Sequence, residues 1–212
     1  MKGVAKAPEI AEEDINVMMA TNVTGLIHMT QAVLPIFKAR GDSGAGDIIN
    51  VGSIAGREPY PGGSIYCATK AAVRSFTDAM RRELIATRIR VMEIDPGQVE
   101  TEFSIVRFGG DKAKADAVYA GCEPLTPDDI AEVVVFAAAR RENVVIADTL
   151  IFPNHQVRLK DSFYFTIRGA DRGKRPRLLS CTRKRNFASR SDEKHRPVLV
   201  ALCIRSPRLR CR

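Results

Sequence analysis

Apolar positions along this chain follow two different spacings, which predict helices and strands in alternation. From residue 11 to about residue 40, apolar residues recur three or four positions apart, which predicts a long helical segment with a broad buried face. Two further helical patterns span about 64–87 and 126–139. Short apolar runs bounded by turn-forming residues predict buried strands near 47–52, 89–95 and 146–151. Strand, helix and strand at this spacing predict a βαβ crossover in a parallel sheet, and therefore an α/β fold.

Three polar residues occupy positions where such a sheet places its chemistry. Ser53 follows the first predicted strand, while Tyr66 and Lys70 are one helical turn apart and share a helix face. A cation beside a tyrosine favours the phenolate, so we expect Lys70 to lower the pKa of Tyr66. Tyr66 would then exchange a proton with an alcohol or carbonyl, and Ser53 would donate a hydrogen bond to the same oxygen. An ordinary helix-face pair has the same spacing, so spacing alone does not decide.

The surrounding motifs carry a more specific signal. The run D-I-I-N-V-G-S-I-A-G contains Ser53, N-V-T-G begins at Asn22 upstream, and D-P-G-Q-V-E-T begins at Asp95 downstream. In this order they resemble the active site of the short-chain dehydrogenase/reductase family. The runs NVMMATNVTGL and VGSIAGREPYPGGSIYCATKAAV most resemble its subgroup of NADP-dependent 3-hydroxy acid dehydrogenases, which act on L-serine and L-allo-threonine. The resemblance covers about residues 1–156.

The resemblance implies a catalytic role for four residues. Tyr66 would move the proton, and Lys70 would lower its pKa and hold the nicotinamide ribose. Ser53 would polarise the substrate carbonyl. Asn22 would hold a water that connects the lysine to solvent as a proton relay. The implied reaction is hydride transfer between NADP and a secondary alcohol or ketone, such as a 3-hydroxy acid.

The resemblance also implies a cofactor site, to which Tyr66 and Lys70 belong. Pro96 and Gly97 would approach the nicotinamide ring. The backbone near Val99 and the hydroxyl of Thr101 would contact the carboxamide. NADP is the expected cofactor, and NAD stays open because the residues that choose between the two are not found in this chain.

Residues that would contact the substrate lie in two loops. Residues 102–122 resemble the family's mobile substrate lid. The loop at 58–63 would lie over the substrate site, with Arg57 and Tyr60 as candidate contacts, although loop arginines are more often solvated charges.

Part of the family's fold has no counterpart in this sequence. Family members begin with a strand, a T-G-x-x-x-G-x-G turn and a helix that hold the cofactor's pyrophosphate on backbone N–H groups. GDSGAGD from Gly41 precedes the serine strand and is therefore interpreted as a turn. We expect the C-terminal part of a Rossmann-type doubly wound parallel sheet, without its first four strands and with the inner edge of the 47–52 strand unpaired. Weak or absent NADP binding would follow, and the alternative function is a catalytically inert interaction module.

Charge divides the chain into two parts. Residues 157–212 carry 17 Lys and Arg against 4 Asp and Glu, whereas the formal charge of the whole chain is +8. We therefore predict a partial catalytic domain at 1–156 and a basic tail of low order at 157–212, in which only 198–204 would form a strand. Clusters such as 183–185 leave binding to nucleic acid or an anionic membrane as an alternative. The abrupt end of the resemblance favours disorder together with an altered reading frame or a retained intron.

Composition sets the remaining expectations. The hydrophobic fraction of 45% is ordinary for a globular protein, and no apolar run is long enough to span a bilayer. A cytoplasmic location follows as the default, with neither membrane nor nucleic acid expected as a partner. The five cysteines are scattered and lack metal-ligand spacing, which predicts free thiols and no metal site. In the family the helices matching 11–40 and 65–87 form the subunit interface, so a homo-oligomer is expected.

Overall fold

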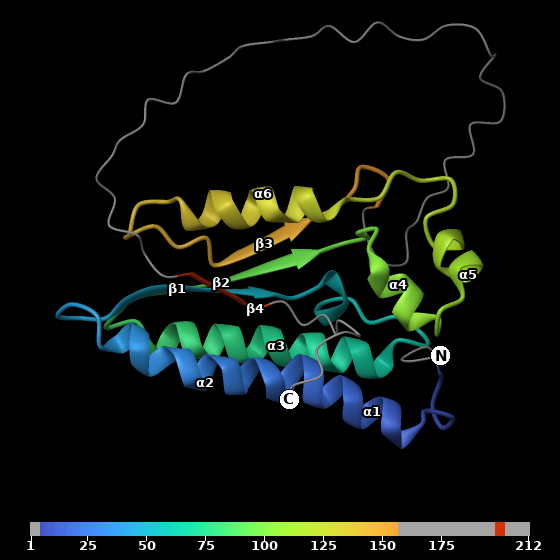
Figure 1. Cartoon of the computed structure of the whole chain (residues 1–212), viewed down its shortest axis with the longest axis horizontal. Helices are drawn as coiled ribbons and strands as arrows, with labels where there is room; N and C mark the ends of the chain where they lie inside the picture. The colour runs from blue at the N-terminus through green and yellow to red at the C-terminus, as the bar shows by residue number, and fades with distance from the viewer. Residues whose placement is uncertain (1–4, 157–197, 202–212) are drawn as a thin grey trace, which may run out of the picture.

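The computed structural model describes residues 5–156 and 198–201. Within them, four parallel strands form one sheet with the order β3-β2-β1-β4 (Figure 1). The strands are β1 (Ala45–Val51), β2 (Arg88–Pro96), β3 (Asp148–Ile151) and β4 (Val198–Ala201). This arrangement confirms the expected α/β fold with a parallel sheet.

Helices cover both faces of the sheet (Figure 1). One face carries α1, a π-helical segment η1, α2 and the crossover helix α3, whereas α6 covers the other. The short elements η2, α4 and α5 lie toward the end of the sheet where the strands finish. Their bounds are α1 (Glu12–Met19), η1 (Ala20–Thr24), α2 (Gly25–Lys38), η2 (Ile54–Gly56), α3 (Ser64–Glu83), α4 (Glu102–Arg107), α5 (Lys112–Ala117) and α6 (Pro127–Ala138).

Alternation along β1 and β2 divides the core into two layers. Ile48 packs with Val91 against α2 and α3, whereas Ile49 packs with Met92 against α6. Successive strand residues point to opposite faces, so neighbouring apolar residues supply both layers. The near-continuous apolar runs in the sequence therefore match strands that are buried on both sides.

A buried ion pair crosses the sheet from β1 to β2. Asp47 and Arg90 are direct neighbours in the strand register, and Arg90 donates from Nε to Asp47 Oδ1 at 2.7 Å and from Nη2 to Oδ2 at 2.5 Å. Arg90 also donates to the carbonyls of Ala138 at 2.8 Å and Val144 at 2.9 Å. A guanidinium at the C-terminal end of α6 satisfies carbonyl groups that the helix leaves without partners.

The predicted elements are present, with different boundaries. Helix α3 ends at Glu83 rather than near 87, and the strand predicted near 146–151 spans Asp148–Ile151. Helix α6 begins as its sequence predicts, with Pro127 in the first turn and a reciprocal capping box between Thr126 and Asp129. The 11–40 pattern is helical throughout, but the π-helical η1 interrupts it, which apolar spacing alone does not predict.

The inner edge of β1 is occupied, which corrects the expectation of an unpaired edge. Strand β4 pairs with β1 in parallel from Asp47 to Asn50. Leu199 of β4 packs against the core layer beneath α2 and α3. The physical reason is that β4 supplies ladder hydrogen bonds and an apolar side chain to an edge that would otherwise expose both. The other residues of the expected tail, 157–197 and 202–212, lie outside the described part of the chain.

None of the helices in the described ranges is long and apolar enough to cross a membrane.

Candidate active site

Ser53 stands directly after β1, at the end of the sheet where parallel strands place ligands. Its backbone is extended, and it caps η2 by accepting a hydrogen bond from the Ala55 N–H to its Oγ at 3.1 Å. The residue before it, Gly52, has no room for a side chain, since an added Cβ would lie 1.9 Å from Asp95 Oδ1. Ser53 is thus held close to the end of β2.

Tyr66 and Lys70 project from the first two turns of α3 toward the same end of the sheet. The Lys70 ammonium is buried, donates to the Val51 carbonyl at 3.0 Å and lies 5.9 Å from the centroid of the Tyr66 ring. Burial raises the pKa of the Tyr66 phenol, and a hydrogen bond with Ser53 partly opposes that rise. The fold therefore brings the serine, tyrosine and lysine of the sequence prediction together.

The expected lowering of the Tyr66 pKa by Lys70 is wrong for this structure. Burial raises the pKa of Tyr66 above its ordinary value, and the opposing effects of Ser53 and Arg107 do not overcome it. The physical reason is that removal from water penalises the charged phenolate.

Asn22 is connected to the same helix through a short chain of hydrogen bonds. It lies in η1, and its Nδ2 donates to Thr69 Oγ1 at 3.0 Å. Thr69 in turn donates to the Tyr66 carbonyl at 2.8 Å. The π-helical turn therefore aims a buried amide at the turn of α3 that carries Tyr66, and π-helical turns are frequent at functional sites.

The turn after β2 brings the four expected cofactor residues to the same end of the sheet. Pro96 ends β2, and the Gly97 N–H donates to the Ile151 carbonyl at 2.7 Å. A Cβ on Gly97 would lie 2.4 Å from Gln156 Oε1, so a larger residue here would have to displace that side-chain amide. The Val99 carbonyl accepts from Tyr119 Oη at 2.9 Å, and Thr101 caps α4 by accepting from the Phe103 N–H at 3.2 Å.

Arg57 faces the sheet. Its Nε donates to Asp95 Oδ2 at 2.8 Å, and its Nη2 pairs with Asp148. These two carboxylates raise the pKa of Arg57 above its ordinary value. Arg107 on α4, which was not among the residues predicted from the sequence, is a second cation that acts on Tyr66, since its charge opposes the rise in the Tyr66 pKa that burial causes.

A carboxyl pair behind Gly52 was also not predicted from the sequence. Glu93 and Asp95 are buried on the same face of β2, and Glu93 Oε1 and Asp95 Oδ1 have no hydrogen-bond partner. Burial, followed by the charge of Asp95, raises the pKa of Glu93 to about 8, so the pair holds a proton near neutral pH. Two acidic residues at i and i+2 within an apolar strand were the available signal.

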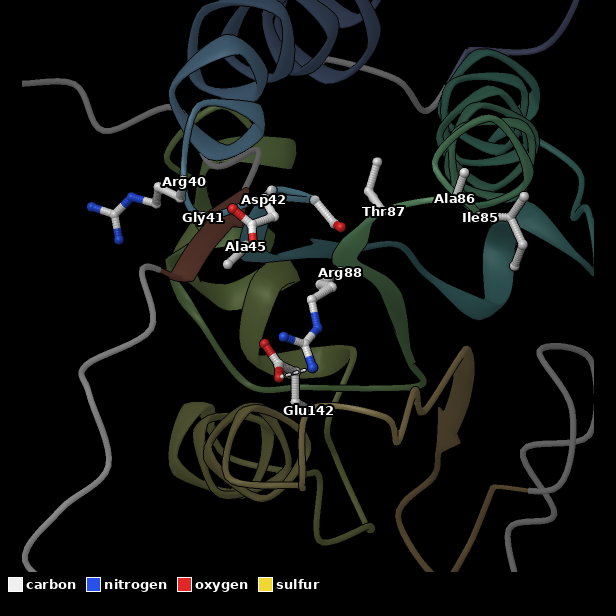
Figure 2. Close-up of a pocket in the computed structure, with 11 residues that line it drawn as sticks. Arg40, Gly41, Asp42, Ala45, Ile85, Ala86, Thr87, Arg88 and Glu142 are labelled. Atoms are coloured by element: carbon white, nitrogen blue, oxygen red, sulfur yellow. Dashed lines mark ion pairs between the residues drawn. The ribbon is translucent and has the colours of Figure 1, made fainter.

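A cavity of about 330 Å³ lies at the opposite end of the sheet, near the starts of β1 and β2 (Figure 2). Its walls include the Gly41–Gly44 turn and Arg88, which pairs with Glu142 at 3.1 Å. The glycine-rich turn therefore lies away from Ser53, as its position before β1 predicts. In the residues that the structure describes, no group of three or more His, Cys, Asp or Glu is placed to hold a metal ion.

Comparison with known proteins identifies the family. The model for short chain dehydrogenases matches residues 1–108, about half of the chain. The chain belongs to this family.

Several relatives and solved structures give the extent of the likeness. An NADP-dependent 3-hydroxy acid dehydrogenase of Schizosaccharomyces pombe is 62% identical over 154 residues, which are 73% of this chain and 58% of that protein. A serine 3-dehydrogenase of Agrobacterium fabrum is 37% identical over 155 residues, covering 73% of this chain and 60% of that enzyme. The closed form of a serine dehydrogenase complexed with NADP+ superposes with a TM-score of 0.69 at 38% identity, covering 82% of this chain and 65% of that one. The chain thus spans less than two thirds of the length of these relatives.

Proposed function

We propose that this chain carries the proton-transfer half of an oxidoreductase site that interconverts a small hydroxy acid and its oxo acid with NADP. The observation that carries the proposal is the meeting of Ser53, Tyr66 and Lys70 at the carboxyl end of the sheet. The relatives named as an NADP-dependent 3-hydroxy acid dehydrogenase and a serine 3-dehydrogenase support this cofactor and this substrate class. NAD stays open as the alternative cofactor.

In the oxidation direction, Tyr66 would accept the hydroxyl proton of the substrate while the carbon–oxygen double bond forms. The hydride acceptor for the same carbon would be supplied by the nicotinamide cofactor when it is bound. Ser53 would hold the substrate oxygen through a hydrogen bond, and the Lys70 ammonium would hold the nicotinamide ribose. Asn22 would hold a water that passes the proton outward, a role supported by its link to α3 through Thr69.

The described residues fit one end of the cofactor better than the other. Lys70 supplies an ammonium for a ribose hydroxyl, and Val99 and Thr101 supply a backbone and a hydroxyl group for the carboxamide. Within residues 5–156 and 198–201, however, no strand leads through a glycine-rich turn into a helix, and the Gly41–Gly44 turn lies at the far end of β1. We therefore infer that binding of NADP by this polypeptide is weak and its turnover impaired.

The assay that tests the proposed function follows NADPH oxidation by the full-length chain with an oxo acid. Tyr66→Phe should lower kcat by about 100- to 10,000-fold, the range for loss of an acid–base group. Ser53→Ala should lower it as well, while Ser43→Ala, an exposed serine at the far end of the sheet, serves as the matched control. Equal rates in the native chain and Tyr66→Phe would contradict the proposed mechanism.

Calorimetry with NADP tests the inferred weak binding separately. A micromolar Kd for NADP would overturn the inference of weak binding.

A second function, as an oligomerisation or interaction module, is favoured by the exposed apolar side chains on the helices. Met29 and Ile36 on α2 are 54% and 59% exposed, and Ile85 just beyond α3 is 82% exposed. The expected homo-oligomer interface through 11–40 and 65–87 would cover this surface. Size-exclusion chromatography of the native chain and of Ile36→Glu distinguishes the cases, since an unchanged elution volume would contradict the interface.

A further inference from the structure

The short helix α4 turns one of its faces toward Tyr66. Phe103 contacts the tyrosine through ring centroids 5.5 Å apart, with the two rings tilted by 40°. Arg107 follows Phe103 by four residues in the same helix, and residues four apart share a face. Arg107 therefore lies one turn further along the face that is in contact with the candidate site.

Aromatic rings hold the guanidinium of Arg107. Its Cζ lies 5.4 Å from the centroid of the Tyr60 ring and 5.9 Å from that of Phe108, within the range of cation–π attraction. Arg57 and Arg90 show a different arrangement, since both form ion pairs with carboxylates of the sheet. No such pair joins Arg107 to any carboxylate among the described residues.

The positive charge of Arg107 acts on both tyrosines of this region. Burial raises the pKa of Tyr60 to about 12 and also raises that of Tyr66, and in each case the charge of Arg107 opposes the effect of burial. Arg107 thus adds a positive charge beside both tyrosines. Such a charge favours an anion over a neutral molecule of the same shape.

We propose that Arg107 binds the anionic group of the substrate, so that the site selects hydroxy acids and oxo acids over neutral alcohols and ketones. A guanidinium has five N–H donors and offers two parallel N–H groups to a carboxylate, so the contact of Arg107 with Tyr60 does not use all of its donors. Because Arg107 belongs to the segment 102–122, the anion would also draw α4 against the site. This inference rests on the proposed function and names the residue that sets its substrate class.

The test compares 3-hydroxybutyrate with its methyl ester, which keeps the carbon skeleton and removes the charge. Arg107→Met should raise KM for the acid by about 10- to 100-fold more than KM for the ester, the loss expected for hydrogen bonds to a charged group. Any change in kcat that arises through the pKa of Tyr66 should be the same for the acid and the ester. Arg107→Lys should fall between the two, since it keeps the charge and loses the planar fork. Arg40→Met, an exposed arginine at the far end of the sheet, is the matched control.

Equal losses for acid and ester in Arg107→Met would overturn the inference while leaving the proposed function intact. If the native chain shows no turnover, calorimetric titration with 3-hydroxybutyrate replaces the kinetic assay. Binding that is lost in Arg107→Met and retained in Arg40→Met would support the inference although the proposed activity has failed. Undetectable binding to the native chain, or binding unchanged in Arg107→Met, would overturn the inference.

Discussion

Arg57 and Asp95 join the segment after β1 to the end of β2 through a hydrogen bond of 2.8 Å between Nε and Oδ2. Asp95 is fully buried, and Arg57 also pairs with Asp148 of β3. One guanidinium therefore ties together three segments at the end of the sheet that carries Ser53. The Asp95 carboxylate that pairs with Arg57 is therefore shielded from water.

Arg57→Met should lower the free energy of unfolding by about 3 kcal/mol, because it leaves a buried carboxylate without its cation. Urea denaturation at neutral pH measures the loss. The matched control is Arg88→Met, which breaks an exposed ion pair with Glu142 and should cost about 0.5 kcal/mol. The double variant Arg57→Met with Asp95→Asn should recover part of the stability; no recovery would contradict the assigned role of the ion pair.

Stability should fall as the pH rises from about 5 to about 8, because of Glu93. Burial and the charge of Asp95 raise the pKa of Glu93 from 4.5 to about 8, so the folded state binds more protons than the unfolded state between these values. Over that range the loss should be on the order of 3 kcal/mol, since one pKa unit corresponds to about 1.4 kcal/mol. Glu93→Gln should flatten the dependence when unfolding is measured at several pH values. An equally steep dependence in this variant would exclude Glu93 as the cause.

Ser53→Ala should raise the pKa of Tyr66 further. Burial raises the pKa of Tyr66, and the hydrogen bond with Ser53 partly opposes this rise by favouring the phenolate. Without that hydrogen bond, the pKa should rise further. NMR titration of ring-labelled tyrosine measures the pKa directly, with Tyr66→Phe to assign the signal. Ser43→Ala should leave the titration unchanged. A Tyr66 pKa that is unchanged or lower in Ser53→Ala would contradict the hydrogen bond as the cause.

Leu199→Asp should release the β1 edge and promote self-association. Leu199 packs against the core layer beneath α2 and α3, and a carboxylate there would be buried without a partner. The expected cost is about 2 kcal/mol or more, and the freed edge would pair with other copies of the chain. Val200→Asp, at a 40% exposed side chain of the same strand, is the control. Association is measured by light scattering. Equal association of the two variants would contradict the pairing of β4 with the β1 edge.

Local sequence signals predicted much of the fold and of the candidate site. The capping box at Thr126 and Asp129, the period of the apolar residues and the one-turn spacing of Tyr66 and Lys70 each act within a few residues along the chain. The positions of Ser53 and of the Pro96–Gly97 turn followed from the rule that parallel strands end at a common edge. No such local rule indicates the π-helical turn around Asn22, because apolar spacing is the same on either side of it.

The sequence by itself determined which segments become helices and strands and that a serine, a tyrosine and a lysine would meet at one end of the sheet. Only the tertiary structure decided the pKa of Tyr66 and which charged side chains lie near it. Burial raises the pKa of Tyr66, and the charge of Arg107 opposes that rise. Arg57 instead pairs with Asp95 of the sheet. Likewise, only packing placed β4 on the edge of β1. The reason is physical: desolvation and charge pairing depend on which distant segments exclude water from a side chain, and adjacent residues do not encode that.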